Sequence, residues 1–448
     1  MAEPREPEPE DTRVRTKRRR WWIWLPAWCF GLLLLTGLLW WAVAGGMGRA
    51  RWKAFQAKHS ELRAKVLSAS PTRRPLEGEA VPGNAWNHYE DAAAAYEKLS
   101  KKEKDQLMEA TYSKSSPEQL ALAFAVLEAH PEIVAAVREG AKRDTFDPPY
   151  QWELGGDMPL DWLPHCRLLS RLLVIETRRR RSQGDLDAAL DCVALGFQVG
   201  SDYGRSGVFI CWLVGVSARG IVMAQAGPIA SDSALTSAQA GRLEQLMKRL
   251  EEELLPLHLS MRADRLSMQF MILRNEGGSI AAFQAGTTPT SGLAGLKTRH
   301  ELTWRHGYSW RLALAEVDDR LEKLTGCLES GATLAWPDAS RQYERFFTSI
   351  QSDPLLEMLL FEPAGCDDSG RSGLARIRLI RAVCHERGTG APENPLPFDP
   401  HTRLPLHRRV DPDKTVYWAE GADGDQGGKG EFDPNSSNTG DIVLEWKK

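Results

Sequence analysis

The residues best suited to chemistry lie near the end of the chain, between Gly421 and Trp446. This segment offers the carboxylate groups of Asp423, Asp425, Glu431, Asp433 and Asp441. Carboxylate oxygens suit Ca²⁺, and the glycines between them let backbone carbonyl groups turn inward. Crowded carboxylates also repel one another unless a cation neutralises them. The segment therefore predicts a Ca²⁺ site, and the alternative is a Gly/Asp-rich surface turn without a specific ligand.

The order of short motifs in this region resembles a known family. The motifs are Asp399-Pro400, Gly421-Ala422-Asp423-Gly424, Gly427-Gly428 and Asp441-Ile442. Residues 366–448 in this respect resemble the C-terminal region of the major pseudopilin of type II secretion systems, whose loop binds Ca²⁺. The resemblance implies Asp423 and Asp441 as side-chain ligands, with Asp433 and Asp425 as further candidates.

The start of the chain departs from the pseudopilin pattern. Pseudopilins carry a short leader and a peptidase site directly before their apolar helix, followed by a glutamate. Here Arg18, Arg19 and Arg20 precede the apolar stretch, which contains no acidic residue. A processed pilin subunit is therefore not expected, and the whole chain resembles larger bacterial membrane-anchored proteins of unknown function.

Catalytic motifs give no firm assignment. His165-Cys166 and Cys384-His385 are sequence neighbours, but neighbours on a helix point about 100° apart and do not form a dyad. The chain has no GxSxG, HExxH or GxxxxGK[ST] motif. We therefore expect a protein that is not an enzyme, and a hydrolase with a site assembled from distant residues stays open as the alternative.

The elements that must position any site are mostly helices. Ser116-Pro117-Glu118-Gln119 is typical of a helix start, and Pro131 is expected to kink the helix that follows. The segment 207–226 is apolar enough for a second membrane span, but Arg219 and its small residues favour a buried core helix. The turn at Gly184-Asp185 resembles that of a tetratricopeptide unit, yet no second copy follows after roughly 34 residues.

A stretch without charged residues runs from Trp21 to Ala44. A helix rises ~1.5 Å per residue, so this stretch spans a hydrocarbon core of about 30 Å. Tryptophans stand at both ends, as in the aromatic belts of membrane helices. We expect a transmembrane helix over residues 21–45. The alternative is a cleaved signal peptide, because Ala42-Val43-Ala44 resembles a cleavage site.

The flanking charges predict the orientation. Six of the eight residues before Trp21 are Lys or Arg, against Arg49, Arg51 and Lys53 on the other side. This excess places the N-terminus in the cytoplasm of a bacterium and the rest of the chain outside its inner membrane. Six cysteines would then lie outside, either paired as disulfides or buried as small apolar side chains.

Together these patterns predict a mainly α-helical protein with one transmembrane helix. An extracytoplasmic helical bundle or solenoid-like domain and a small C-terminal β-hairpin and loop segment would follow. The expected divisions are a disordered tail (1–20), the transmembrane helix (21–45), a juxtamembrane helix and linker (49–83), the α-helical domain (84–365) and the pseudopilin-like segment (366–448).

The expected role is that of a non-enzymatic scaffold or interaction module of the cell envelope. Its partners would be the lipid bilayer and another envelope protein, with Ca²⁺ ordering the C-terminal loop. An assembly factor of a secretion or pilus-like machine is a further alternative. The net charge of −3 gives no overall basic footprint, so a nucleic-acid partner is not expected.

Overall fold

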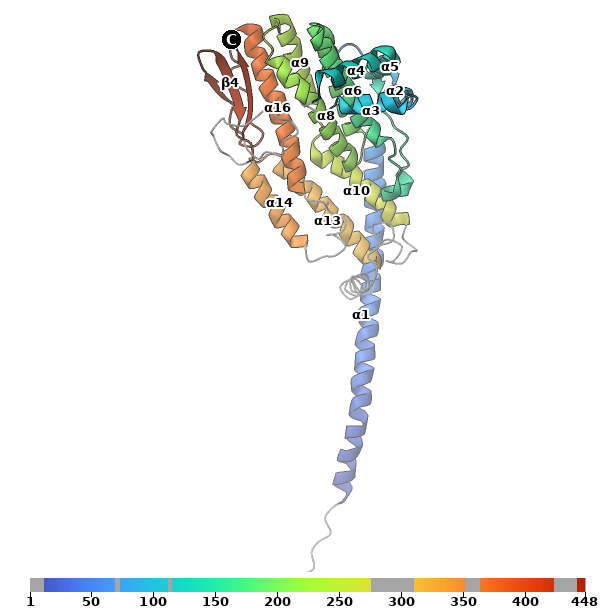
Figure 1. The fold of residues 1–448 in the computed structure, drawn as a ribbon. Coiled ribbons are helices and arrows are strands. Elements are labelled where there is room, and N and C mark those ends of the chain that lie inside the picture. Colours follow the sequence, from blue (N-terminus) through green and yellow to red (C-terminus); the bar gives the residue numbers. More distant parts are fainter. Residues whose placement is uncertain are drawn as a thin grey trace, which may run out of the picture. The chain divides into compact units, whose positions relative to one another are not determined.

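The computed structural model describes residues 12–68, 73–111, 115–274, 310–350, 363–422 and 441–447. Figure 1 shows the elements of the fold, and the contacts within the chain divide it into two units. Residues 1–58 and 278–317 form the first unit, and residues 59–277 and 318–448 form the second. The second unit holds the candidate site.

The described part of the chain is mainly helical, which confirms the predicted helical class. Its helices are α1 (Thr12–Ser68), α2 (Ala85–Glu97), α3 (Lys101–Glu109), α4 (Pro117–Ala129), α5 (Pro131–Ala141), the 3-10 helix η1 (Trp152–Asp157), α6 (Leu163–Ser182), α7 (Leu186–Arg205), α8 (Phe209–Ala230), α9 (Ser237–Glu253), α10 (Leu257–Arg274), α13 (Trp310–Gly331), α14 (Trp336–Ile350) and α16 (Pro363–Thr389).

Strands form two small sheets. The antiparallel sheet has the order β3 (His407–Val410), β4 (Lys414–Ala419), β5 (Ile442–Lys447), with Arg409 opposite Val416 and Ala419 opposite Ile442. A short parallel pair joins β1 (Val81–Asn84) to β2 (Arg143–Thr145). The small C-terminal β-hairpin that the sequence predicts is therefore confirmed.

Local signals in the sequence begin and bend the helices. The Ser116 hydroxyl accepts from the backbone N–H of Gln119, and the Gln119 side chain accepts from that of Ser116, which is a complete capping box. Pro131 cannot continue the ladder of α4, and α4 and α5 meet there at 70°. The predicted helix start and kink are both confirmed.

Helices α7 and α8 make an unusually close contact in the centre of the second unit. A Cβ atom at Gly215 of α8 would lie 2.5 Å from the Cα of Gly204 and 2.6 Å from the carbonyl oxygen of Gly200, both on α7. Only hydrogen fits at this point, so the two backbones touch. Helix α6 packs beside both helices (Figure 1).

A buried ion pair ties the start of the second unit to α7. The Asp202 carboxylate accepts from Arg73 Nε at 2.6 Å and from Arg73 Nη2 at 2.7 Å. Tyr89 Oη and Gln198 Nε2 also donate to it, each at 2.7 Å. This carboxylate is fully satisfied, so the cluster serves the fold.

The C-terminal sheet shares a hydrophobic core with α9 and α16. Tyr417 and Leu444 pack in one cluster with Leu243 of α9 and Leu379 of α16. Arg408 of β3 adds a two-pronged ion pair to Glu386 of α16, at 2.6 and 2.9 Å. The sheet is therefore fixed to the helices by both apolar and charged contacts.

Apolar helices occur in both units. In α1 of the first unit, large side chains from Trp28 to Trp40 are exposed, Leu33 to 70%. In the described residues, α8 is the helix long and apolar enough by itself to cross a membrane. Most of α8 is buried inside the second unit, where Ala218 and Val222 lie in the core. The prediction of a buried core helix over residues 207–226 agrees with this packing.

Candidate functional site

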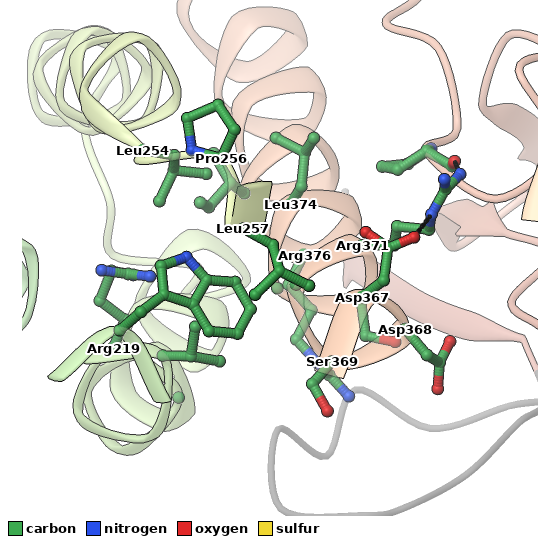
Figure 2. A pocket seen from close by; sticks show the side chains of 18 of the residues that line it. Arg219, Leu254, Pro256, Leu257, Asp367, Asp368, Ser369, Arg371, Leu374 and Arg376 are labelled. Carbon is green, nitrogen blue, oxygen red and sulfur yellow. Dashed lines mark hydrogen bonds and ion pairs between the residues drawn. The ribbon is translucent and has the colours of Figure 1, made fainter. Parts of the chain in front are cut away.

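A pocket of about 830 Å³ opens between α8, the turn from α9 to α10, and α16 (Figure 2). This volume lies within the range of roughly 300–1,000 Å³ that is usual for small-molecule sites. Much of its wall is apolar, formed by Trp212, Val216, Leu254, Leu257, Leu374 and Ile377. Of the described residues, five arginines and three carboxylates also line it.

Helices α8 and α16 each present one side to the pocket, because residues three and four positions apart lie on the same side of a helix. On α8, Trp212, Val216 and Arg219 recur at three- and four-residue spacing and so share one side of the helix. On α16, Asp367, Arg371 and Leu374 recur in the same way.

The break between α9 and α10 closes the corner of the pocket. Pro256 stands in the three-residue turn where the helical ladder stops. The carbonyl group of Leu255 is thereby free to accept from Trp212 Nε1, at 2.8 Å. This hydrogen bond fixes the large indole ring at the edge of the pocket.

The carboxylates that line the pocket are all engaged with cations or hydrogen-bond donors. Glu251 accepts from Arg378 at 2.7 Å and from Arg381 at 2.9 Å. Asp367 accepts from Arg371 Nε at 2.8 Å. Asp368 Oδ1 lies 3.0 Å from Nε2 of His401. Each of these three carboxylates therefore already has a partner within the protein.

Arg371 is a structural cation of the pocket wall. Its Nη1 donates to the carbonyl groups of Leu334 and Pro400, and its Nη2 donates to that of Gly331. With Asp367 on Nε, the guanidinium is used on every side. It therefore joins α16 to the end of α13 and to the turn at Pro400.

Arg219 differs from Arg371 and Arg378 because it has no carboxylate partner among the described residues. Its Nη1 donates to the carbonyl group of Gly200 at 3.1 Å. Burial is the main reason that the pKa of Arg219 is lowered to about 10, and the charge of nearby Arg205 acts in the same direction. The side chain is still protonated at neutral pH, so the pocket holds a cation without a matching anion.

The glycines of α7 hold the Arg219 side chain in place. A Cβ atom at Gly204 would lie 2.9 Å from Arg219 Nη1, and one at Gly200 would lie 2.8 Å from Arg219 Cγ. The arginine therefore lies in a groove that is open only because both positions are glycine and carry no side chain. Sequence reasoning missed this role, although glycines spaced four apart at 196, 200 and 204 were a readable sign of close helix packing.

Two histidines near the pocket have environments that shift their pKa values in opposite directions. Burial lowers the pKa of His258, which lines the pocket. His401 is fully buried between Asp368 and Asp399. Burial alone would lower the pKa of His401, but the two carboxylates outweigh it and raise the pKa above its ordinary value.

The cysteine–histidine neighbours of the sequence do not form dyads. His165 Nδ1 lies 2.9 Å from Glu90, while Cys166 is buried in the core. His385 contacts Glu244 at 2.9 Å, while Cys384 is also buried. No disulfide joins any of the seven cysteines, all of which lie in the described ranges, and burial raises the pKa of Cys211 to about 11. The buried thiols, Cys166, Cys192, Cys211 and Cys384, act as small apolar side chains.

The predicted Ca²⁺ ligands lie mostly outside the described residues. This holds for Asp423, Asp425 and Asp433, whereas Asp441 is a buried residue directly before β5. Gly421, with φ of 68°, follows β4 at the same end of the hairpin. Within the described ranges no group of three or more acidic, histidine or cysteine side chains could hold a metal ion.

Comparison with known proteins gives no match for this chain among protein-family models, curated proteins or solved structures.

Proposed function

We propose that this chain is a membrane-anchored envelope protein whose helical unit is a non-enzymatic binding module. The observation that carries the proposal is the pocket beside α8, with its apolar walls and a volume of about 830 Å³. Its ligand has an apolar body that fills the space between Trp212, Val216 and Leu374. A binding role is supported because the acids of the wall are already paired.

The anchor is supported by the surface of α1. Large apolar side chains between Trp28 and Val43 are exposed around the helix, and water is a poor solvent for such a surface. The basic residues from Arg13 to Arg20 precede this stretch. We place α1 across the bacterial inner membrane with the N-terminus in the cytoplasm and the binding unit outside.

The test measures binding of a neutral, single-chain probe to the pocket. The full chain is reconstituted in phosphatidylcholine nanodiscs, and [1-¹³C]decanol is titrated and followed by NMR, with protein-free nanodiscs as background. We expect saturable binding in excess of the background. The variant Val216→Trp should abolish this excess because the indole would fill the pocket.

The matched control is Val410→Trp, which introduces the same side chain at a position that is 47% exposed on β3. This control should bind decanol as the wild type does. Equal signals from the wild type and Val216→Trp, with both proteins folded by circular dichroism, would contradict the proposed binding role.

A further inference from the structure

We infer that the ligand of this pocket is an amphiphile with a hydrocarbon tail and one anionic head, which pairs with Arg219. The inference rests on the proposed binding function and specifies the chemistry of its ligand. Arg219 is the starting point, because a partly buried cation is costly unless an anion or hydrogen-bond acceptors satisfy it.

The guanidinium of Arg219 has donors to spare. It carries five N–H groups, and one of them is used on the carbonyl group of Gly200. Among the described residues no carboxylate lies within ion-pair distance of it, whereas Glu251 and Asp367 are taken by Arg378 and Arg371. A carboxylate or phosphate from a ligand would therefore be the missing partner.

The position of Arg219 is fixed before any ligand arrives. Its side chain lies in the groove over Gly200 and Gly204, where any larger residue would collide with it. A guanidinium that is already oriented loses little conformational freedom on pairing. The charge stays on this group at neutral pH, because its pKa remains about 10 despite burial.

The other residues of the pocket favour a ligand with a hydrocarbon tail over a multiply charged ligand. A nucleotide or another multiply charged ligand would need several free cations at one point. Arg371 and Arg378 are saturated by carboxylates and carbonyl groups, and Arg403 already donates to the carbonyl groups of Ala332 and Leu334. Arg376, the remaining arginine of the lining, also has an interaction partner. The apolar surface of Trp212, Val216 and Leu374 instead accommodates a hydrocarbon tail.

The experiment compares [1-¹³C]decanoate with [1-¹³C]decanol on the full chain in phosphatidylcholine nanodiscs. Wild-type protein should bind decanoate more tightly. Arg219→Gln should lower decanoate affinity roughly tenfold or more, as expected for loss of a hydrogen bond between charged groups, and leave decanol affinity within about twofold. Arg345→Gln, which changes an exposed arginine of α14 outside the pocket lining, is the matched control and should keep decanoate affinity.

A second measurement needs only the wild-type protein, so it tests the inference even if Arg219→Gln does not fold. The bound decanoate carboxyl group, observed directly by its ¹³C shift, should titrate at lower pH in the pocket than in protein-free nanodiscs, because a cation favours the carboxylate. Titration at the same or a higher pH would overturn the inference. Unchanged decanoate affinity in folded Arg219→Gln would also overturn it, while decanol binding would leave the proposed function standing.

The anionic head could belong to a free fatty acid or to a lipid of the surrounding bilayer. Repeating the titration in phosphatidylglycerol nanodiscs distinguishes the two sources. Competition by phosphatidylglycerol supports an anionic bilayer lipid as the ligand, and unchanged decanoate binding supports a free single-chain acid.

Discussion

At the scale of single residues, the same side chain carries different roles according to its neighbours. Arg371 donates to Asp367 and to three carbonyl groups, so it is a cross-link within the fold. Arg219 lines the same pocket, and in the described part of the chain its hydrogen-bond partner is the carbonyl group of Gly200, with no carboxylate beside it. The difference lies in what α7 and α16 present to each arginine.

Asp264 lies in an environment that disfavours the charged form of its carboxyl group. Burial raises the pKa of Asp264 to about 6, although the backbone N–H of Phe209 at the start of α8 donates to it and acts in the opposite direction. The folded state thus binds this proton more tightly than the unfolded chain does. Folding stability contributed by this group is therefore lost as pH rises from about 4 to about 6.

We predict that Asp264→Asn stabilises the protein at pH 8 and has little effect near pH 4. Each pKa unit corresponds to about 1.4 kcal/mol, so the gain in unfolding free energy reaches up to roughly 3 kcal/mol above pH 7. The amide oxygen of asparagine still accepts from Phe209. Thermal melts of wild type and variant across this pH range measure the effect.

Asp264→Ala is the matched variant, because it also removes the acceptor for the Phe209 N–H. It should gain less than Asp264→Asn at pH 8. A melting temperature of Asp264→Asn below that of the wild type at pH 8 would show that the charge is not the dominant cost.

At the scale of elements, the contact between α7 and α8 decides where the pocket forms. Gly200 and Gly204 on α7 and Gly215 on α8 bring the two backbones together. Arg219 lies in the same groove and donates to the carbonyl group of Gly200, and α8 and α16 both line the pocket. The position of one pocket wall therefore depends on the absence of a side chain at these three glycines.

We predict that Gly215→Ala lowers the melting temperature. Alanine favours a helix by about 1 kcal/mol over glycine, but its Cβ would meet backbone atoms of α7 at 2.5 and 2.6 Å. Backbone cannot move aside as a flexible side chain can, so overpacking of roughly 1–3 kcal/mol outweighs the gain. Differential scanning calorimetry of the reconstituted chain measures the difference.

Gly326→Ala in α13 is the control for helix propensity. It lies exposed within a helix, and a Cβ atom there meets nothing within 4 Å. The control should be neutral or slightly stabilising. If both alanine variants raise the melting temperature, the close contact of α7 and α8 is not a constraint on the fold.

At the scale of the whole molecule, the C-terminal segment is coupled to the helical unit. Tyr417 and Leu444 lie in one core with Leu379 of α16. Other residues of α16, among them Leu374, line the pocket. The strands β4 and β5 meet at Ala419 and Ile442, so the loop between them begins and ends at one edge of the sheet. Binding of Ca²⁺ between these two strands would therefore stabilise the second unit.

We predict that Ca²⁺ added after chelation binds saturably and raises the melting temperature of the full chain. A ligand at a hundredfold excess over its Kd stabilises by about 2.7 kcal/mol through mass action. Asp423→Ala should remove the effect, and isothermal titration calorimetry with thermal melts measures it. The control Asp413→Ala, on the exposed turn before β4, should retain it. No heat and no shift at millimolar Ca²⁺ would refute the Ca²⁺ site.

Local features were determined by the sequence alone. The capping residues Ser116 and Gln119, the break at Pro131 and the hairpin around Val416 act through neighbours a few positions away, so their effects can be read without a fold. The buried character of α8 was also readable, because Arg219 and the small residues of that segment fit a packed core better than lipid.

Only the tertiary structure decided the candidate site. Trp212, Pro256 and Arg371 are far apart in sequence, and the turn after α9, the face of α16 and the groove of α7 bring them to one pocket. Whether an arginine has a carboxylate partner depends on long-range packing that residue spacing does not encode. Glycines four apart can signal close helix contact, but they do not say which helix approaches or which charge lies between.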